Sequence, residues 1–474
     1  MRAATARQVT FADVELIRQG VCLEPTLAAI SQLLDTQEEM IERVRSDLVR
    51  GLKNPDKGRP GLTAPQVLRS LVLMRIKNWD YRELRERIAD GCTLRQFTEF
   101  YCDQVPKHDA FNRGINRLTP ETLASVNDMV VEAAVELGLE DGGKLRVDTT
   151  VVQTDIHHPT DSTLLWDVVR VVTRVVCRLA KAQGQRCIKG FRDRRRAARR
   201  RMQELQRMTA RQRGERQTET YRALIEIAEE VVANARAAFD ATGKSRGKDT
   251  QAMIEIDVLR AEIAHYCDLG ERVISQARRR VLNGEQVPNA EKIFSIFEPH
   301  TDLIMRGKVR TPVEFGHKVF LAESAIGLIT QYEVLDGNPA DEVHVVPSLG
   351  RHRQTFHHAP ELYAGDRGFD SQRNVTACEK AAVKMICLPQ RGGGRTAERE
   401  ALEKSAAFKK GQKFRAGVEG RISVLFRGRG MKRCLAEGKL HFELFVGAAV
   451  LADNLMIIAA QLSKRSSRRR KVIH

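Results

Sequence analysis

Three acidic residues, far apart in the chain, have the types and settings that metal-assisted phosphate chemistry requires. Asp148 lies inside the largely apolar stretch KLRVDTTVVQTDI, and Asp366 directly follows the short run LYAG. Glu419 lies in FRAGVEGRISVLF, flanked by Arg415 and Arg421. Asp148 is the most informative of the three, because an unpaired charge in an apolar strand is costly. Clustered together, the three carboxylates would repel one another and shift toward protonation unless a cation lay among them.

A divalent cation resolves this repulsion. Mg²⁺ prefers hard oxygen ligands and keeps coordination positions open for phosphate oxygens and water. Two such ions, about 3.5–4 Å apart, activate a water or a 3′-hydroxyl and stabilise the leaving oxygen. The three carboxylates therefore predict phosphodiester cleavage and transfer with two Mg²⁺ ions, or Mn²⁺ as the alternative, and without a protein nucleophile.

The elements that must bring these acids together follow from periodicity. Residues 145–152 alternate with a period of two, which predicts a strand with Asp148 and Val147 on opposite faces. The segments EFGHKVFLAE and GLITQYEVL predict an antiparallel hairpin. Two shorter strands are predicted at Glu361–Ala364 and in VKMICLP, with helices near Asp341–Leu349, around Ser371–Ala382 and after the last strand.

Once the helical insert after the first strand is set aside, the order is β-β-β-α-β-α-β-α. This is the strand order of an RNase H-like fold, an α/β architecture with a mixed five-stranded sheet. In that sheet the first strand is central and the fourth lies beside it, so Asp148 and Asp366 can converge. A helix after the fifth strand can bring Glu419 alongside them.

The remaining segments are predicted to be mostly helical. From Pro25 to Leu48 apolar residues recur every three or four positions, which predicts one helix whose seam packs against its own chain or against a second copy. Thr63 is a predicted helix cap with Pro65 in the first turn, and Asp161 is a predicted cap of a later helix. The expected divisions are an N-terminal helix and linker at 1–60, a helical DNA-binding or dimerisation domain at 61–140, a catalytic domain at 141–462 with a helical basic insertion at 162–290, and a basic tail at 463–474.

Charge predicts a polyanionic partner. Lys and Arg outnumber Asp and Glu by 79 to 61, which gives a net charge of +18, and nucleic acid is the first candidate. A basic protein that merely stays soluble is the alternative. The arginines expected to contact DNA phosphates are Arg82 and Arg85 on a short helix, Arg194, Arg195 and Arg196 in the insertion, and Arg415, Arg421 and Arg427 near the third acid. The short helices around Arg82 suit a helix-turn-helix-like unit, or a plain bundle with a solvated basic face.

Cysteine usage and apolar segments bear on location. The nine cysteines are scattered singly, which fits a reducing cytosol better than a disulfide framework or a zinc site. The first twenty residues carry charges where a signal peptide needs an apolar core. Asp453 and Asn454 interrupt the most apolar segment, LFVGAAVLADNLMIIAAQL, so it is predicted to be a buried helix rather than a membrane span. We expect a cytoplasmic, nucleoid-associated protein with no membrane partner.

From roughly Gly61 to Leu462 the sequence resembles bacterial insertion-sequence DDE transposases whose third acid lies in a Tyr-x2-Arg-x3-Glu-x6-Lys signature. The resembling segments are VDTTVV, HHPTDSTLL, VEFGHKVFL, YAGDRGFDS and RAGVEGRISVLF. The resemblance implies that the three acids bind the metals and that Arg415 is the signature arginine that contacts DNA phosphate. Gln412 stands where the signature has Tyr, and Phe426 stands where it has Lys, one residue before Arg427.

The resemblance further implies an enzyme that cuts and joins DNA at insertion-sequence ends. Its partners would be double-stranded DNA, both the terminal inverted repeats and the target, and a second copy of the chain in a homodimer or higher oligomer. Two alternatives stay open. One is a non-catalytic DNA-binding protein derived from a transposase, and the other is an RNase H-like structure-specific nuclease that cleaves without joining.

Overall fold

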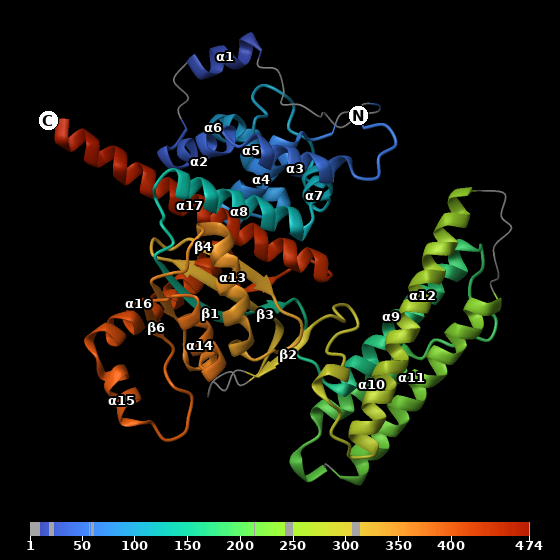
Figure 1. Cartoon of the computed structure of the whole chain (residues 1–474). Helices are drawn as coiled ribbons and strands as arrows, with labels where there is room; N and C mark the ends of the chain where they lie inside the picture. Colours follow the sequence, from blue (N-terminus) through green and yellow to red (C-terminus); the bar gives the residue numbers. More distant parts are fainter. Residues whose placement is uncertain are drawn as a thin grey trace. The chain divides into compact units, whose positions relative to one another are not determined.

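The computed structural model describes residues 10–18, 23–55, 57, 61–212, 214–241, 250–305 and 313–473 (Figure 1). The chain divides into two compact units. Unit 1 combines Met1–Gln153 with His317–His474, and unit 2 is Thr154–Gly316. The predicted insertion, 162–290, lies within unit 2.

Unit 1 begins with a set of helices. They are α1 (Phe11–Arg18), α2 (Pro25–Asp35), α3 (Glu38–Val49), α4 (Ala64–Lys77), α5 (Tyr81–Asp90), α6 (Cys92–Phe97), α7 (His108–Ile115) and α8 (Pro120–Glu136). The capping prediction for α4 is confirmed, because the Thr63 hydroxyl accepts a hydrogen bond from Gln66 N and Pro65 lies in the first turn. The predicted breaks near Asn78–Asp80 and at Gly91 are also confirmed.

The prediction of one helix from Pro25 to Leu48 is wrong. The structure has two helices, α2 and α3, separated at Thr36–Gln37. The Thr36 hydroxyl donates to the Leu33 carbonyl at 2.9 Å, a local side-chain bond that competes with continuation of the helix. The apolar seam of both helices packs into the core of unit 1 itself.

The strands form a seven-stranded mixed sheet in the order β2-β3-β1-β5-β6, with β4 paired to β3 and β7 paired to β1. β2 belongs to the residue range of unit 2, and the other strands lie wholly or mostly in unit 1. The strands are β1 (Lys144–Thr154), β2 (Asp302–Met305), β3 (Val313–Ser324), β4 (Ile329–Val334), β5 (Leu362–Ala364), β6 (Met385–Cys387) and β7 (Arg433–Cys434). β1 runs parallel to β5 and β5 parallel to β6, whereas β3 is antiparallel to β4. The five predicted strands correspond to β1, β3, β4, β5 and β6.

Helices cover both faces of this sheet (Figure 1). They are η4 (Asp341–His344), α13 (Val345–Phe356), η5 (Arg367–Phe369), α14 (Gln372–Lys380), α15 (Ala397–Lys404), α16 (Ala406–Gly428) and α17 (Lys439–Ile473). Leu145 and Val147 of β1 share a core with residues of α13 and α14, while Val152 shares a core with residues of α16 and α17. The predicted alternation of β1 is therefore confirmed.

Helix α17 is the long apolar helix predicted near the end of the chain. By length and composition Lys439–Arg465 could span a membrane, but 83% of its apolar window is buried inside the protein. This burial confirms the prediction of a core helix. Within the described part of the chain no other helix passes the same test.

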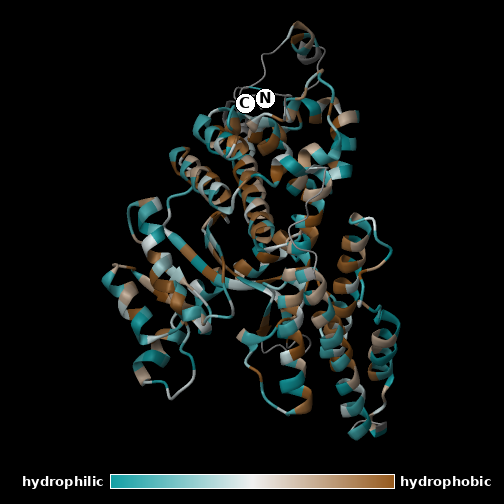
Figure 2. Cartoon of the chain, turned by 90° about the vertical axis from the view of Figure 1, so that its right-hand side faces the viewer, coloured by the Kyte–Doolittle hydropathy of each residue, from teal (hydrophilic) through white to brown (hydrophobic). Residues whose placement is uncertain are grey.

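Unit 2 is built on four long helices with their own apolar core. Its elements are α9 (Asp161–Ala182), α10 (Arg195–Arg207), η1 (Ala210–Gln212), α11 (Glu215–Ala241), α12 (Thr250–Ala277), the π-helical turn η2 (Arg278–Leu282) and η3 (Asn289–Glu291). Helix α9 packs against α10, α11 and α12. Figure 2 shows apolar (brown) and polar (teal) residues on different sides of the helices, as amphipathic packing requires.

The predicted cap of α9 is wrong by one residue. Thr160, not Asp161, caps the helix, and it forms a capping box with Thr163. Asp161 instead accepts hydrogen bonds from Arg280 at 2.8 Å and from Gln276 at 3.2 Å. Its carboxylate is thus used to hold α9 to the end of α12.

Candidate active site

The three predicted acids share one partner, the guanidinium of Arg415. Its Nη2 lies 2.9 Å from Asp148 Oδ2 and 3.7 Å from Asp366 Oδ2. Its Nη1 lies 3.3 Å from Glu419 Oε1. Residues separated by more than two hundred positions in the chain therefore meet at one cationic side chain.

Asp148 is the buried member of the three, with only 12% of its side chain exposed. It projects from β1 toward α16, and the Thr149 amide donates to its Oδ1 at 2.8 Å. Burial raises the pKa of Asp148 to about 6, Arg415 opposes this rise, and the nearby Asp366 adds to it. The site thus places a carboxylate where ionisation is costly and a cation is needed.

Asp366 is placed by a tight turn at the end of β5. In the parallel register Arg146 pairs with Ala364, so Asp148 and Asp366 each lie two residues beyond that pair. The Asp366 carboxylate caps η5 by accepting from Gly368 N at 2.8 Å, and Phe369 anchors the turn in the core. A Cβ at Gly365 would come within 2.8 Å of Leu388 Cδ2 and 3.2 Å of Phe369 Cβ, so a side chain there would force its neighbours to shift.

Glu419 lies on α16, one helical turn after Arg415, and 70% of its side chain is exposed. Helix α16 approaches the sheet closely, because a Cβ at Gly411 would meet Cys387 and one at Gly417 would meet the Arg146 guanidinium. Gln412, at the position of the signature Tyr, donates to the Cys387 carbonyl at 2.8 Å. It therefore ties α16 to the end of β6.

The other two signature positions lie further along α16. Phe426 is half-buried against the apolar core that α16 and α17 share with the sheet. Arg427 is exposed, and its Nε donates to Ser423 Oγ at 2.9 Å. The structure thus leaves Arg427 at the surface, and its contact with DNA stays a prediction.

A fourth carboxylate, Asp341, lies near the site and was not predicted as a site residue. It accepts from Thr149 Oγ1 at 2.9 Å and pairs with Lys318 Nζ at 2.7 Å. Asp341 contributes to the raised pKa of Asp148. The sequence signal that could have revealed this group is Lys318, a lysine inside the apolar strand VEFGHKVFL, because a buried ammonium requires an acidic partner.

Arg421 is committed to the interior. It pairs with Glu323 at 3.3 Å and with Asp453 at 3.0 Å, and these two carboxylates are 0% and 1% exposed. Arg146 also pairs with Glu323, and Arg429 with Asp453. The predicted DNA contact of Arg421 therefore remains a prediction, while its observed partners assign it to holding the sheet against α16 and α17.

The remaining arginines predicted to contact DNA differ in exposure and in whether they pair with a carboxylate. Arg194 pairs with Glu230 at 3.0 Å and Arg195 with Asp193 at 2.7 Å. Arg196 is exposed and has no ion pair or hydrogen bond with any residue that the structure describes. On α5, Arg82 is exposed and Arg85 is half-buried.

The donors around Arg415 suit a hard divalent cation. With the side chains as they lie, no group of three or more His, Cys, Asp or Glu residues in the described ranges is arranged to hold a metal ion. The donor set is nevertheless oxygen-only, and a cation beside Asp148 and Asp366 would offset the same burial and repulsion that the guanidinium now offsets. The residue types therefore fit Mg²⁺. In the structure as it stands, the Arg415 guanidinium pairs with these carboxylates.

Comparison with known proteins adds one finding. Neither the curated proteins nor the solved structures include a match to this chain. Residues 17–117, which include α2 to α7, match the family model described as "Transposase domain (DUF772)". A transposase domain implies DNA binding and DNA processing in general. This match covers the N-terminal helices and supports a transposase role, consistent with the resemblance of the sequence to insertion-sequence transposases.

Proposed function

We propose that the protein is a DDE transposase that cleaves DNA at insertion-sequence ends and joins those ends to target DNA. The observation that carries this proposal is the convergence of Asp148, Asp366 and Glu419 on one guanidinium. Burial of Asp148 and the i,i+4 spacing of Arg415 and Glu419 explain two of these contacts, but not why Asp366 from a separate turn meets them at the same point. A shared substrate or cation does.

The sheet supports the finer assignment to an RNase H-like core. Its central strand β1 lies between β3 and β5, β5 and β6 run parallel to it in succession, and β3 and β4 form an antiparallel pair. Asp148 on the central strand and Asp366 at the end of its parallel neighbour then lie at one edge of the sheet. Ligand sites in open α/β sheets form at such strand ends.

In the proposed reaction Asp148, Asp366 and Glu419 hold Mg²⁺. Bound ions supply activation of a water or 3′-hydroxyl and stabilisation of the leaving oxygen. The chain's own contribution is positional: the Thr149 amide orients Asp148, the Gly368 amide orients Asp366, and α16 carries Glu419 and Arg415 together. Arg415, released from the carboxylates, would place its guanidinium on a DNA phosphate.

The wider setting of the proposal is a DNA complex. The N-terminal helices, where the transposase domain matches, would grip double-stranded DNA at the terminal inverted repeats. A dimer or higher oligomer would hold two ends together in the bacterial cytoplasm. The basic composition supports this partner, because Lys and Arg exceed Asp and Glu by 79 to 61.

The decisive experiment incubates the full chain with Mg²⁺ and DNA that carries the element's own ends. We expect strand cleavage by the wild type and a loss of roughly 10²-fold or more for Asp148→Ala, because even residues that only support metal ligands are worth 10–100-fold. Asp257→Ala, which removes an exposed carboxylate on α12, is the matched control.

Each outcome decides between the alternatives. Cleavage that persists in Asp148→Ala would remove the metal-site proposal. DNA binding without cleavage by the wild type would favour a non-catalytic descendant of a transposase. Cleavage without joined products would favour a structure-specific nuclease.

A further inference from the structure

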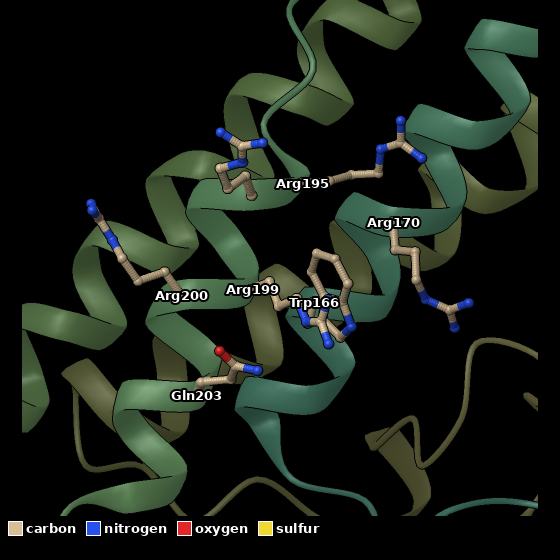
Figure 3. A pocket seen from close by; sticks show the side chains of 7 residues that line it. Trp166, Arg170, Arg195, Arg199, Arg200 and Gln203 are labelled. Atoms are coloured by element: carbon tan, nitrogen blue, oxygen red, sulfur yellow. The ribbon is translucent and has the colours of Figure 1, made fainter.

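Unit 2 contains a pocket of about 530 Å³ that the proposed chemistry does not use. Five arginines, Trp166 and Gln203 line it, and Figure 3 shows their side chains on the neighbouring helices α9 and α10. Its size lies within the range of small-ligand sites. The combination of an indole ring with several guanidinium groups indicates a ligand with both aromatic and anionic parts.

The local sequence explains how α10 presents this surface. In RRAARRRMQ, residues 196, 199, 200 and 203 are three or four positions apart and share one face of the helix. Ala198 and Met202, on the opposite face, are buried in the core of unit 2. Trp166 lies on α9 and is half-buried, so its position is fixed while part of its ring stays accessible.

The charges in the pocket are only partly compensated. Arg170 pairs with Asp167 at 2.7 Å and Arg195 with Asp193 at 2.7 Å. Arg196, Arg199 and Arg200 are exposed, and none of them has an ion pair or hydrogen bond with a residue in the described ranges. Three cations within two helical turns repel one another, and an anionic partner would relieve that repulsion.

We propose that this pocket binds an unpaired segment of a DNA strand, with the free arginines on its phosphates and a base stacked on Trp166. In a duplex the faces of the bases are covered by their neighbours, so the indole ring would add nothing to binding. An unpaired base offers its face, and aromatic stacking is the usual means of holding one without reading sequence. The proposal rests on the proposed function only in taking DNA as the partner.

The test uses Trp166 as its own reporter. The chain has two tryptophans, so Trp79→Phe leaves Trp166 as the one source of indole fluorescence. Without Mg²⁺, we expect an oligothymidylate to quench this fluorescence saturably and a blunt duplex of the same length to quench it far less. Fluorescence anisotropy of a labelled oligothymidylate, with Trp79 retained, measures affinity independently of that substitution.

Matched variants identify the contacts. Arg199→Gln combined with Arg200→Gln is expected to weaken oligothymidylate binding roughly tenfold and to lower the salt dependence by about 1.4, or about 0.7 for each lost phosphate contact. Trp166→Leu is expected to weaken binding by roughly 5–150-fold, the range for loss of one stacked base. Arg222→Gln combined with Arg272→Gln removes the same charge from exposed positions elsewhere in unit 2 and should leave affinity nearly unchanged.

The proposal is overturned by equal quenching with duplex and unpaired DNA, or by equal loss of affinity in the two double-arginine variants. Neither the quenching nor the anisotropy measurement involves strand cleavage. A wild type that does not cleave DNA would therefore refute the proposed function and leave the pocket proposal standing. If the wild type cleaves DNA but unpaired DNA does not change its Trp166 fluorescence, the pocket proposal is refuted and the proposed function stands.

Discussion

The arginines around the candidate active site and those on one face of α10 are used in opposite ways. Around the candidate active site in unit 1, Arg146, Arg415 and Arg421 each pair with carboxylates and keep less than a fifth of the side chain exposed. On α10 in unit 2, Arg199 and Arg200 are exposed and uncompensated among the residues described. Basic composition alone therefore does not identify a DNA contact. Arg146 and Arg421, whose acidic partner Glu323 is buried, hold the fold, whereas Arg199 and Arg200 are available to a ligand.

The largest expected effect concerns an arginine that pairs with a buried carboxylate. Arg146 donates to Glu323 Oε2 at 2.7 Å and to the Phe414 carbonyl at 2.7 Å. Because Glu323 is 0% exposed, Arg146→Ala would leave a buried carboxylate with only Arg421. We expect the free energy of unfolding to fall by about 3–5 kcal/mol, measured by urea denaturation of the full chain. A loss below ~1 kcal/mol would show that this pair does not hold the sheet.

A second, smaller effect concerns how completely Arg415 compensates Asp148. The pKa of Asp148 is raised to about 6 in the folded protein, above its ordinary value of 3.8. The native state therefore binds more protons than the unfolded chain between about pH 4 and 6, and wild-type stability falls as pH rises through that window. Asp148→Asn lacks this cost, so it should gain stability relative to wild type by up to about 3 kcal/mol between pH 4 and 7.

The free energy of unfolding of Asp148→Asn and of the wild type is measured by urea denaturation without metal at about pH 4 and about pH 7. Asp257→Asn, at an exposed position on α12, is the control and should follow the wild-type profile. Parallel profiles for Asp148→Asn and wild type would mean that Arg415 fully neutralises the cost of burying the carboxylate.

The smallest effect tests the uncompensated side. Arg199→Gln and Arg200→Gln should each change the free energy of unfolding by less than about 0.5 kcal/mol, because neither guanidinium has an ion pair or hydrogen bond with the part of the chain that the structure describes. The same urea experiment measures this. If either variant lost as much free energy of unfolding as Arg146→Ala, these arginines would stabilise the fold, and the two groups of arginines would not differ in use.

Much of the fold could be predicted because its signals are local. The alternation in β1 and the apolar runs of β3 and β4 are long enough to establish a period. The four-residue β2 and the two-residue β7 were not predicted, although β5 and β6, with three residues each, were. The error over Pro25–Leu48 arose because the apolar spacing continues through Thr36, whose hydroxyl bonds back to the preceding turn. The spacing of apolar residues carries no information about such a side-chain-to-backbone hydrogen bond.

The candidate site was predictable in part. The spacing of Arg415 and Glu419 is that of an i,i+4 ion pair, so their contact was legible in the sequence. The meeting of Arg415 with Asp148 depends on how closely α16 approaches β1, which in turn depends on glycines such as Gly417. Asp341 is the first residue of η4, and although Lys318 signals that an acid lies nearby, no pattern in the chain specifies which carboxylate it is.

Helix α17 has a consequence for how the molecule is made. Its residues Leu451 and Leu455 complete the core of the N-terminal helices, and its Phe442 and Val450 complete the core beneath the sheet. Since α17 is synthesised after all the other described elements, the segment that carries the transposase match cannot close its core on the ribosome until α17 has emerged. A nonsense mutation shortly before Lys439 would therefore release a polypeptide with two open apolar surfaces, suited to aggregation and proteolysis rather than to acting as a DNA-binding fragment.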